Sequence, residues 1–380
     1  VAEDAPAVAR LRAAGAIPLG VTNTSEVCMW MESYNRVYGL TSNPYDPSRT
    51  VGGSSGGEGA IVGSGASPFG LGADVGGSIR MPAFFNGVFG HKCSPGLVTN
   101  EGQFPGPSGR VDRYLSTGPL CRRAEDLEPL LRILAGAAAE RLKPVAAVDV
   151  SALRVVQFAR ELAIPPDADQ MDARDRAVQA LMARGARIEA VHLPLMAHAR
   201  DLWTAMLASA GSDNTFADHM FGTRSPLAPL KELGRLALRR SDHTFPLIAL
   251  ALFERIPELT PARTKKLCAQ ALTLKLQLED TLGDDGVLIT PTYPTVAPKH
   301  YKAMLPPFNF VNCAIFNALS LPVTAVPTGL NAGGVPTGVQ VVAKEGNDHL
   351  TLACALALEG ALGGWAYPVV SHVVSGAIAR

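Results

Sequence analysis

The spacing of apolar residues along the chain follows two periods, one typical of helices and one typical of strands. Apolar residues recur every three or four positions in four segments, which predicts amphipathic helices over residues 5–16, 124–139, 172–186 and 347–362. Short apolar runs predict strands over residues 17–23, 153–159, 187–193, 287–292, 321–330 and 336–343. Because helices and strands alternate, the pattern predicts an α/β fold with helices packed on the faces of one sheet.

Two segments differ from this alternation. Residues 195–282 have helical apolar spacing almost throughout, and residues 51–102 are rich in Gly, Ser and Pro but also carry apolar residues, unlike a solvated linker. Since strands are predicted on both sides of the helical middle, we expect a single domain over residues 1–380. Residues 195–282 would be a helical insertion in that domain.

The composition narrows the range of functions. The 380 residues are 47% hydrophobic and 18% charged, and their formal net charge is zero. A nucleic-acid-binding protein needs an excess of clustered Lys and Arg, so we expect no nucleic acid partner. The six cysteines are scattered without a CxxC pair, which argues against a zinc site or a disulfide framework. The sequence contains no run of 18 or more apolar residues, so it predicts no membrane-spanning helix.

Two glycine-rich segments that contain serine carry the candidate chemistry. VGGSSGGEGAIVGSG spans residues 51–65, and GLGADVGGSIR spans residues 70–80. Neither has the lysine of a Walker phosphate loop, and the second spaces its glycines wrongly for a dinucleotide fingerprint. The first contains a GxSxG pattern around Ser55, but Pro44 and Pro47 precede it where a nucleophile elbow requires a strand.

A third interpretation joins the two segments in one site. A serine hydroxyl needs a base to become a nucleophile, and a neutral lysine can accept the proton through a second hydroxyl. The DVGGS sequence that ends at Ser78 offers consecutive backbone N–H groups for an oxyanion, and a helix can begin at this serine. Lys92 is the nearest lysine and the candidate base. Asp74 and Arg80 flank the serine, and we expect them to pair across the turn in a structural role.

These residues resemble the signature of the amidase signature family, serine hydrolases with a Ser–Ser–Lys triad. The resemblance rests on GGSSGGEGA followed by GLGADVGGSIRMPAFFNGVFGHK, and on AGAIPLGVTNTSE before them. It continues in DDGVLITPTYPTVAPKH, FNALSLPVTAVPTGLNAGGVPTGVQVVA and NDHLTLACALALEGALGGW, and is weakest between residues 145 and 280. It implies the amidase-signature α/β fold, a large mixed twisted β-sheet core covered by helices on both faces.

The resemblance also implies a role for each site residue. Ser78 corresponds to the acyl-enzyme nucleophile, and Ser54 to the serine that relays the proton, which in the family follows a cis peptide bond. Cys28 lies where the family places a residue that lines the site. The oxyanion hole corresponds to the backbone N–H groups of Val75, Gly76, Gly77 and Ser78. This chemistry requires no metal and no organic cofactor.

The family's catalytic lysine lies before AGAIPLGVTN, in a segment that this sequence does not include. The resemblance places Lys92 after the signature helix, in a structural position. We therefore expect residues 1–380 to be an N-terminally truncated amidase domain that has little or no turnover as it stands.

The expected substrate is a long-chain fatty-acid amide, because CMWMES, RMPAFFNGVFGHK, TVAPKH and GGW resemble family members that act on such amides. Residues 195–282 would then shape an acyl channel. Residues 234–256 combine arginines with a compact apolar run, which is compatible with a membrane-surface contact and equally with an ordinary buried helix. We expect an intracellular, membrane-associated protein, and the resemblance allows a homodimer.

Two alternatives stay open. The first is an amidase of small amides or of the amidotransferase type, in which the acyl site would be narrower and more polar. The second is a non-catalytic form that binds lipid.

Overall fold

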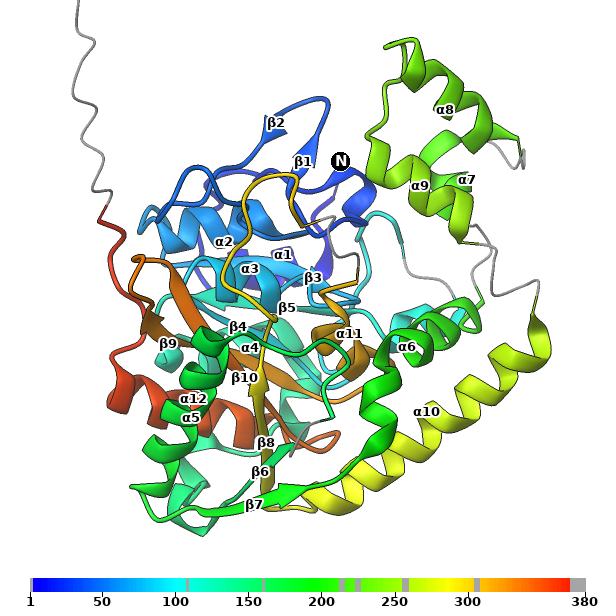
Figure 1. Ribbon diagram of the computed structural model, residues 1–380. Coiled ribbons are helices and arrows are strands. Elements are labelled where there is room, and N and C mark those ends of the chain that lie inside the picture. The colour runs from blue at the N-terminus through cyan, green and yellow to red at the C-terminus, as the bar shows by residue number, and fades with distance from the viewer. Residues whose placement is uncertain are drawn as a thin grey trace, which may run out of the picture.

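A mixed β-sheet forms the centre of the molecule (Figure 1). The computed structural model describes residues 3–106, 109–158, 161–211, 216–222, 227–254, 260–303 and 308–369. The strands of the sheet are β3 (Phe69–Asp74), β4 (Phe89–Lys92), β5 (Ser116–Cys121), β6 (Arg154–Phe158), β7 (Arg187–Val191), β8 (Gly286–Pro291), β9 (Val323–Leu330) and β10 (Pro336–Val342). Their order is β3-β5-β4-β9-β10-β8-β6-β7. β6 is parallel to β7 and β8, and the other neighbours are antiparallel, so the expected mixed sheet is confirmed.

Helices cover both faces of this sheet, as the sequence predicted. One face packs against α4 (Leu127–Ala135), α5 (Ala168–Met182) and α12 (Asp348–Leu362), with α1 (Pro6–Ala13) lying on α4. The other face packs against α2 (Gly56–Gly63), α3 (Arg80–Phe85), α6 (Ala199–Ala208), α10 (Pro261–Leu282) and α11 (Val311–Ala318). A small hairpin of β1 (Tyr34–Asn35) and β2 (Gly39–Leu40) lies outside the sheet.

The two-sided burial follows from the sequence of the central strands. In β8, Val287 and Ile289 enter the core beneath α5 and α12, whereas Leu288 enters the opposite core beneath α10 and α11. Successive strand residues point to opposite faces, so a strand covered on both sides must be apolar at consecutive positions. The consecutive apolar residues 287–289 of β8 therefore reflect the place of this strand in the middle of the sheet.

The structure corrects the sequence prediction at two places. Residues 17–23 do not form a strand, and Ile17, Leu19 and Val21 are exposed, because no described segment pairs with this stretch of backbone. Strands β3, β4 and β5 form part of the sheet but come from glycine- and proline-containing sequence that predicted no strand.

The predicted helical middle is helical over most of its described residues, and part of it stands apart from the sheet. Figure 1 shows α7 (Phe216–Phe221), α8 (Ala228–Ala237) and α9 (Phe245–Phe253) grouped at one corner of the molecule. They share a small core of Ala217, Met220, Leu247, Ile248 and Ala251. We call these three helices the helical cap. None of the helices within the described ranges has the length and apolar character needed to cross a membrane.

Candidate active site

Ser54 lies in a tight turn that depends on glycine. The Gly53–Ser54 peptide bond is cis, as the family resemblance predicted for the relay serine. A Cβ atom on residue 53 would overlap the Trp30 carbonyl oxygen, so only glycine allows this close approach. The Ser33 hydroxyl donates to the Ser54 carbonyl oxygen at 3.1 Å and accepts a hydrogen bond from the Gly56 N–H at 2.9 Å. These contacts fix the turn, in which Ser54 is buried.

Ser78 lies in the turn between β3 and α3, two residues before the helix begins. The Asp74 carboxylate accepts hydrogen bonds from the N–H groups of Gly77 at 2.6 Å and Ile79 at 3.1 Å. Gly77 has a φ of +111°, and a Cβ there would lie 2.8 Å from the Cβ of Cys313. The Asp74 side chain and the Gly77 backbone together hold this turn, where Ser78 is half-buried.

The two serine turns contact each other directly. The Ser55 N–H donates a 3.3 Å hydrogen bond to the Ser78 carbonyl oxygen. The Ser55 hydroxyl accepts a 3.2 Å hydrogen bond from the Ala73 N–H. This side chain therefore links the turn that contains Ser54 to β3. That placement does not favour the GxSxG interpretation, in which Ser55 would be the nucleophile. The structure thus brings the segments of Ser54 and Ser78 into one site.

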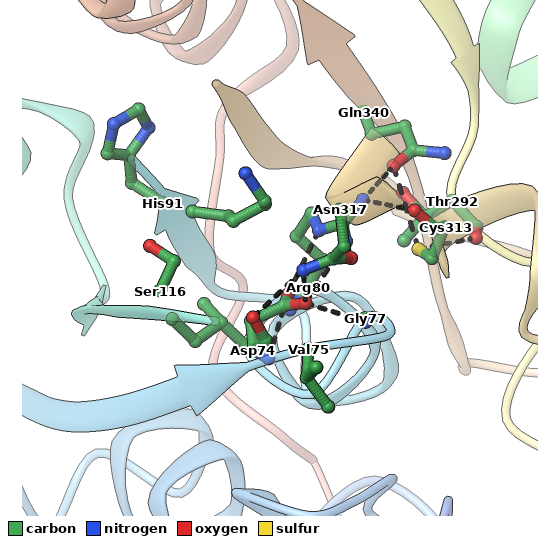
Figure 2. Close-up of polar contacts among 12 residues, drawn as sticks. Asp74, Val75, Gly77, Arg80, His91, Ser116, Thr292, Cys313, Asn317 and Gln340 are labelled. Atoms are coloured by element: carbon green, nitrogen blue, oxygen red, sulfur yellow. Dashed lines mark hydrogen bonds and ion pairs between the residues drawn. The ribbon is translucent and has the colours of Figure 1, made fainter. Parts of the chain in front are cut away.

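A buried ionic network surrounds Asp74 and Arg80, as Figure 2 shows. Asp74 and Arg80 are both 0% exposed and form the ion pair that their positions predicted, with Nε and Oδ2 3.0 Å apart. The guanidinium of Arg80 donates from all three of its nitrogens. Besides Asp74, the acceptors are the Cys313 carbonyl and the side chains of Asn317 and Gln340.

The network keeps the Asp74 carboxylate ionised. Burial alone would raise the pKa of Asp74, but the charge of Arg80 and the surrounding hydrogen-bond donors lower it from 3.8 to about 2. Asn317 adds hydrogen bonds to the Asp74 carbonyl at 2.8 Å and to its carboxylate at 2.9 Å. Sequence reasoning missed Asn317 and Gln340, because a single amide residue in an apolar segment has no distinctive spacing.

The four N–H groups expected at the oxyanion hole differ in their surroundings. The Gly77 N–H donates to Asp74, whereas the N–H groups of Val75, Gly76 and Ser78 have no acceptor among the described residues. The Trp203 indole N–H donates a 3.3 Å hydrogen bond to the Val75 carbonyl oxygen and so restrains the peptide plane beside them. No sequence motif marked this tryptophan, which comes from α6.

Lys92 is bound away from both serines. Its ammonium group is buried and donates a 2.8 Å hydrogen bond to the Leu321 carbonyl oxygen. Burial lowers the pKa of Lys92 from 10.5 to about 8, and the nearby charge of Arg80 adds to this effect. Across the described ranges, no lysine donates a hydrogen bond to Ser54 or Ser78.

Cys28 lies near Ser54 in space. Burial raises the pKa of its thiol. The thiol also lies 3.7 Å from the Phe104 carbonyl oxygen. The role that the resemblance implies for Cys28, lining the site, stays a prediction.

An apolar cluster backs the two turns. A Cβ on Gly52 would lie 3.0 Å from the Phe85 ring, and one on Gly77 would lie 3.3 Å from the Met81 side chain. These residues share the cluster with Met31, Phe84, Tyr293 and Cys313. Within the described part of the chain, no group of three His, Cys, Asp or Glu side chains is placed to hold a metal ion. The site is thus a pair of serines set against aromatic and sulfur-containing side chains.

Comparison with known proteins agrees with this arrangement. The Amidase family model matches residues 1–352 of the chain. Fatty-acid amide hydrolase 2-A of Danio rerio is 47% identical over 374 residues, and fatty-acid amide hydrolase 2 of Homo sapiens is 46% identical over 374 residues. Each alignment covers 96% of this chain and 70% of the relative.

A solved structure shows the same fold. A bacterial aryl acylamidase of the amidase signature family matches with a TM-score of 0.73 at 20% identity, over 95% of this chain and 76% of that chain. The amidase-signature fold that the motifs implied is confirmed by this likeness. The family model and the relatives at 47% and 46% identity show that the chain belongs to the amidase family of amide hydrolases.

Proposed function

We propose that the protein hydrolyses long-chain fatty-acid amides to a fatty acid and an amine. The Ser78 hydroxyl attacks the amide carbonyl, and the N–H groups of Val75, Gly76 and Ser78 stabilise the tetrahedral oxyanion. Ser54 passes the proton of Ser78 to a basic group and returns it to the leaving amine. Water then hydrolyses the acyl ester and restores Ser78.

The observation that carries the mechanism is the contact between the two serine turns, the 3.3 Å hydrogen bond from the Ser55 N–H to the Ser78 carbonyl oxygen. It supports a concerted role for hydroxyls that are far apart in the sequence. The substrate class rests on the fatty-acid amide hydrolases among the relatives and on the apolar cluster behind the turns. A site for small amides would need more polar walls.

The base that accepts the proton from Ser54 needs a test of its own. Since Lys92 is held by the Leu321 carbonyl, the described residues offer Ser54 no lysine partner. We propose that residues 1–380 expressed alone turn over little substrate, and that the protein expressed from its own gene is active. Equal rates of hydrolysis in the two preparations would contradict this part of the proposal.

The experiment uses a fluorophosphonate probe and an oleoyl amide with the protein expressed from its own gene. Ser78→Ala should abolish labelling and lower the rate of hydrolysis by about 10⁴- to 10⁶-fold, and Ser54→Ala by at least about 100-fold. Ser55→Ala is the matched control, because it removes a hydroxyl in the same turn that has no catalytic role. Labelling of Ser78→Ala at the wild-type rate would refute the assignment, and preference for short acyl amides would refute the substrate class.

We further propose that the helical cap contacts a membrane surface. The apolar run around α9 is mostly internal, since Leu247 and Ile248 are buried, while residues 255 and 256 lie outside the described residues. Exposed apolar side chains lie instead on α8, at its C-terminal end and at the first residue of α9: Leu230 at 55%, Leu238 at 68% and Phe245 at 48% exposure. The exposed cations beside them are Lys231, Arg235, Arg239 and Arg240. Apolar and basic groups together favour an anionic lipid surface.

Co-sedimentation with phosphatidylserine-containing vesicles tests the membrane contact. The triple change of Leu230, Leu238 and Phe245 to Ser should lower the bound fraction by about tenfold or more, since each apolar side chain contributes roughly 1.5–3 kcal/mol when buried. Changing Leu272 and Leu276 of α10 to Ser is the matched control, because they are similarly exposed at 55% and 68%. An equal bound fraction for the two variants would refute the proposal.

A further inference from the structure

One loop joins the helical cap to the relay serine. This loop, residues 25–30, includes a short 3-10 turn at Glu26–Cys28. On one side it contacts the cap, and on the other it contacts the Ser54 turn.

Glu26 makes the contacts to the cap. One carboxylate oxygen lies 2.5 Å from Nδ1 of His243, and the other accepts a 2.9 Å hydrogen bond from the Thr244 N–H. Thr244 immediately precedes α9, so the carboxylate satisfies a free N–H at the positive end of this helix. Both side chains of this contact are largely shielded, with 14% exposure for Glu26 and 22% for His243. Charge-assisted hydrogen bonds of this kind are among the stronger ones in proteins.

Apolar contacts run beside these polar contacts. The side chains of Val27 and Trp30 pack against the core of the cap, which contains Leu247 and Ile248. Trp30 packs at the same time against the cluster behind the serine turns. The loop therefore belongs to two cores, one in the cap and one at the candidate active site.

The opposite side of the loop faces the relay serine. The Trp30 carbonyl oxygen lies only 2.4 Å from the position that a Cβ of residue 53 would occupy, so the loop packs directly against the Gly53–Ser54 turn. A displacement of the loop would therefore move atoms that touch the residue before Ser54.

The loop backbone needs outside support. Val27 has a φ of 53° and Cys28 a φ of 57°, in the left-handed region that β-branched residues rarely adopt. Such conformations persist where surrounding contacts hold them. Glu26 is adjacent to this pair and carries the strongest contact of the loop to another element.

We propose that Glu26 is a positioning residue through which the helical cap sets the conformation of the loop beside Ser54. Contact of the cap with lipid is thereby communicated to the relay serine. This regulatory consequence rests on the proposed function, whereas the positioning role of Glu26 does not.

The test measures alkylation of Cys28 by iodoacetamide, followed by mass spectrometry, in the protein expressed from its own gene. Glu26→Ala should raise the alkylation rate of Cys28 by about tenfold, because a charge-assisted contact no longer holds the loop. Cys268 of α10, which is also partly exposed, is an internal control and should stay within about twofold. Glu26→Gln, which can keep both contacts, should stay near the wild-type rate.

A second variant and a double mutant make the test specific. His243→Ala lies in the cap and should reproduce the effect of Glu26→Ala, and the double mutant should be no faster than either single one. Unchanged alkylation in both single variants would overturn the proposal, as would a double mutant whose effects multiply. Should Glu26→Ala fail to fold, His243→Ala and Glu26→Gln decide the outcome.

The enzymatic readout separates this inference from the proposed function. In Glu26→Ala the kcat per fluorophosphonate-titrated site should fall several-fold for an oleoyl amide and for a short acyl amide, with a smaller change in KM, because the loop no longer positions Ser54. A loss of stability alone would lower the number of titrated sites but leave the kcat per site unchanged. If no amide is hydrolysed by any variant, the proposed function fails, but the alkylation rates still decide the role of Glu26.

Discussion

Replacing Asp74 by Asn tests the ionic network that supports the Ser78 turn. The carboxylate accepts hydrogen bonds from the N–H groups of Gly77 and Ile79 and pairs with the guanidinium of Arg80. Asn has nearly the same shape but no charge, and its NH₂ group cannot accept a hydrogen bond. The change therefore leaves the buried Arg80 charge without its counter-ion.

The expected magnitude follows from the complete burial of both partners. Removing one member of a buried ion pair costs about 3–5 kcal/mol. With an unfolding entropy of roughly 2.1 cal/mol/K per residue, a chain of 380 residues loses about 4–6 °C in melting temperature for that cost. Labelling of Ser78 should fall as well, because one of the two N–H groups that Asp74 binds in this turn loses its acceptor.

Differential scanning calorimetry with a matched variant checks this. Asp285 pairs with Arg154 at the same 3.0 Å separation, but it is 49% exposed, so Asp285→Asn should cost less than about 1 kcal/mol. A melting temperature of Asp74→Asn within about 1 °C of the Asp285→Asn value would refute the reasoning.

The pH dependence gives a second check on Asp74. Its folded pKa of about 2 lies below its ordinary value of 3.8. The stabilisation is therefore present above about pH 4 and is lost as the pH falls towards 2, where the unfolded chain binds the proton first. Asp74→Asn should melt with a weaker acid dependence than wild type over this range, and an identical dependence would contradict the assignment.

Three further changes test other parts of the structure. Gly53→Ala should abolish fluorophosphonate labelling of Ser78, because a Cβ there would overlap a neighbouring carbonyl oxygen; wild-type labelling would contradict that close approach. Between about pH 8 and pH 10.5 only the unfolded chain keeps the proton of Lys92, so the melting temperature of the wild type should rise with pH in this range. Lys92→Met should remove that rise. Equal slopes of melting temperature against pH in variant and wild type would count against this assignment. Asp348→Ala should lower the melting temperature by several degrees, since it leaves the Ser94 N–H, now bonded at 2.8 Å, without an acceptor in the core. A calorimetric change below about 1 °C would show that this network contributes little to stability.

The sequence predicts the fold well where apolar patterning dominates. Strands β8, β9 and β10 are buried over most of their length on both faces, so apolar residues dominate their sequences. Helices α4 and α12 follow from apolar spacing and from the Asn347–Asp348 start. Residues 17–23 have the same local signal as a strand, but pairing with a neighbour decides strand formation, and local sequence does not contain that information.

The candidate site is predictable only in part, for a physical reason. Ser54, Ser78 and the pairing of Asp74 with Arg80 are visible because they lie within one stretch of dense motif. The contacts of Trp203 and Asn317 with the same turn join residues more than 120 positions apart in the chain, so no local pattern reports them.

The three missed strands and the placement of Ser78 have one cause. Gly72 of β3, Gly90 of β4 and Gly118 of β5 all face the side chain of Ile79, which directly follows the nucleophile candidate. A Cβ on these glycines would lie 3.1, 2.9 and 3.2 Å from Ile79, which is 0% exposed. The absence of side chains at these glycines leaves a recess in the sheet in which the Ile79 side chain packs. This packing holds the neighbouring Ser78 turn close to the sheet. Because glycine also lowers strand propensity, the residues that make this recess remove the sequence signal for the strands that contain them.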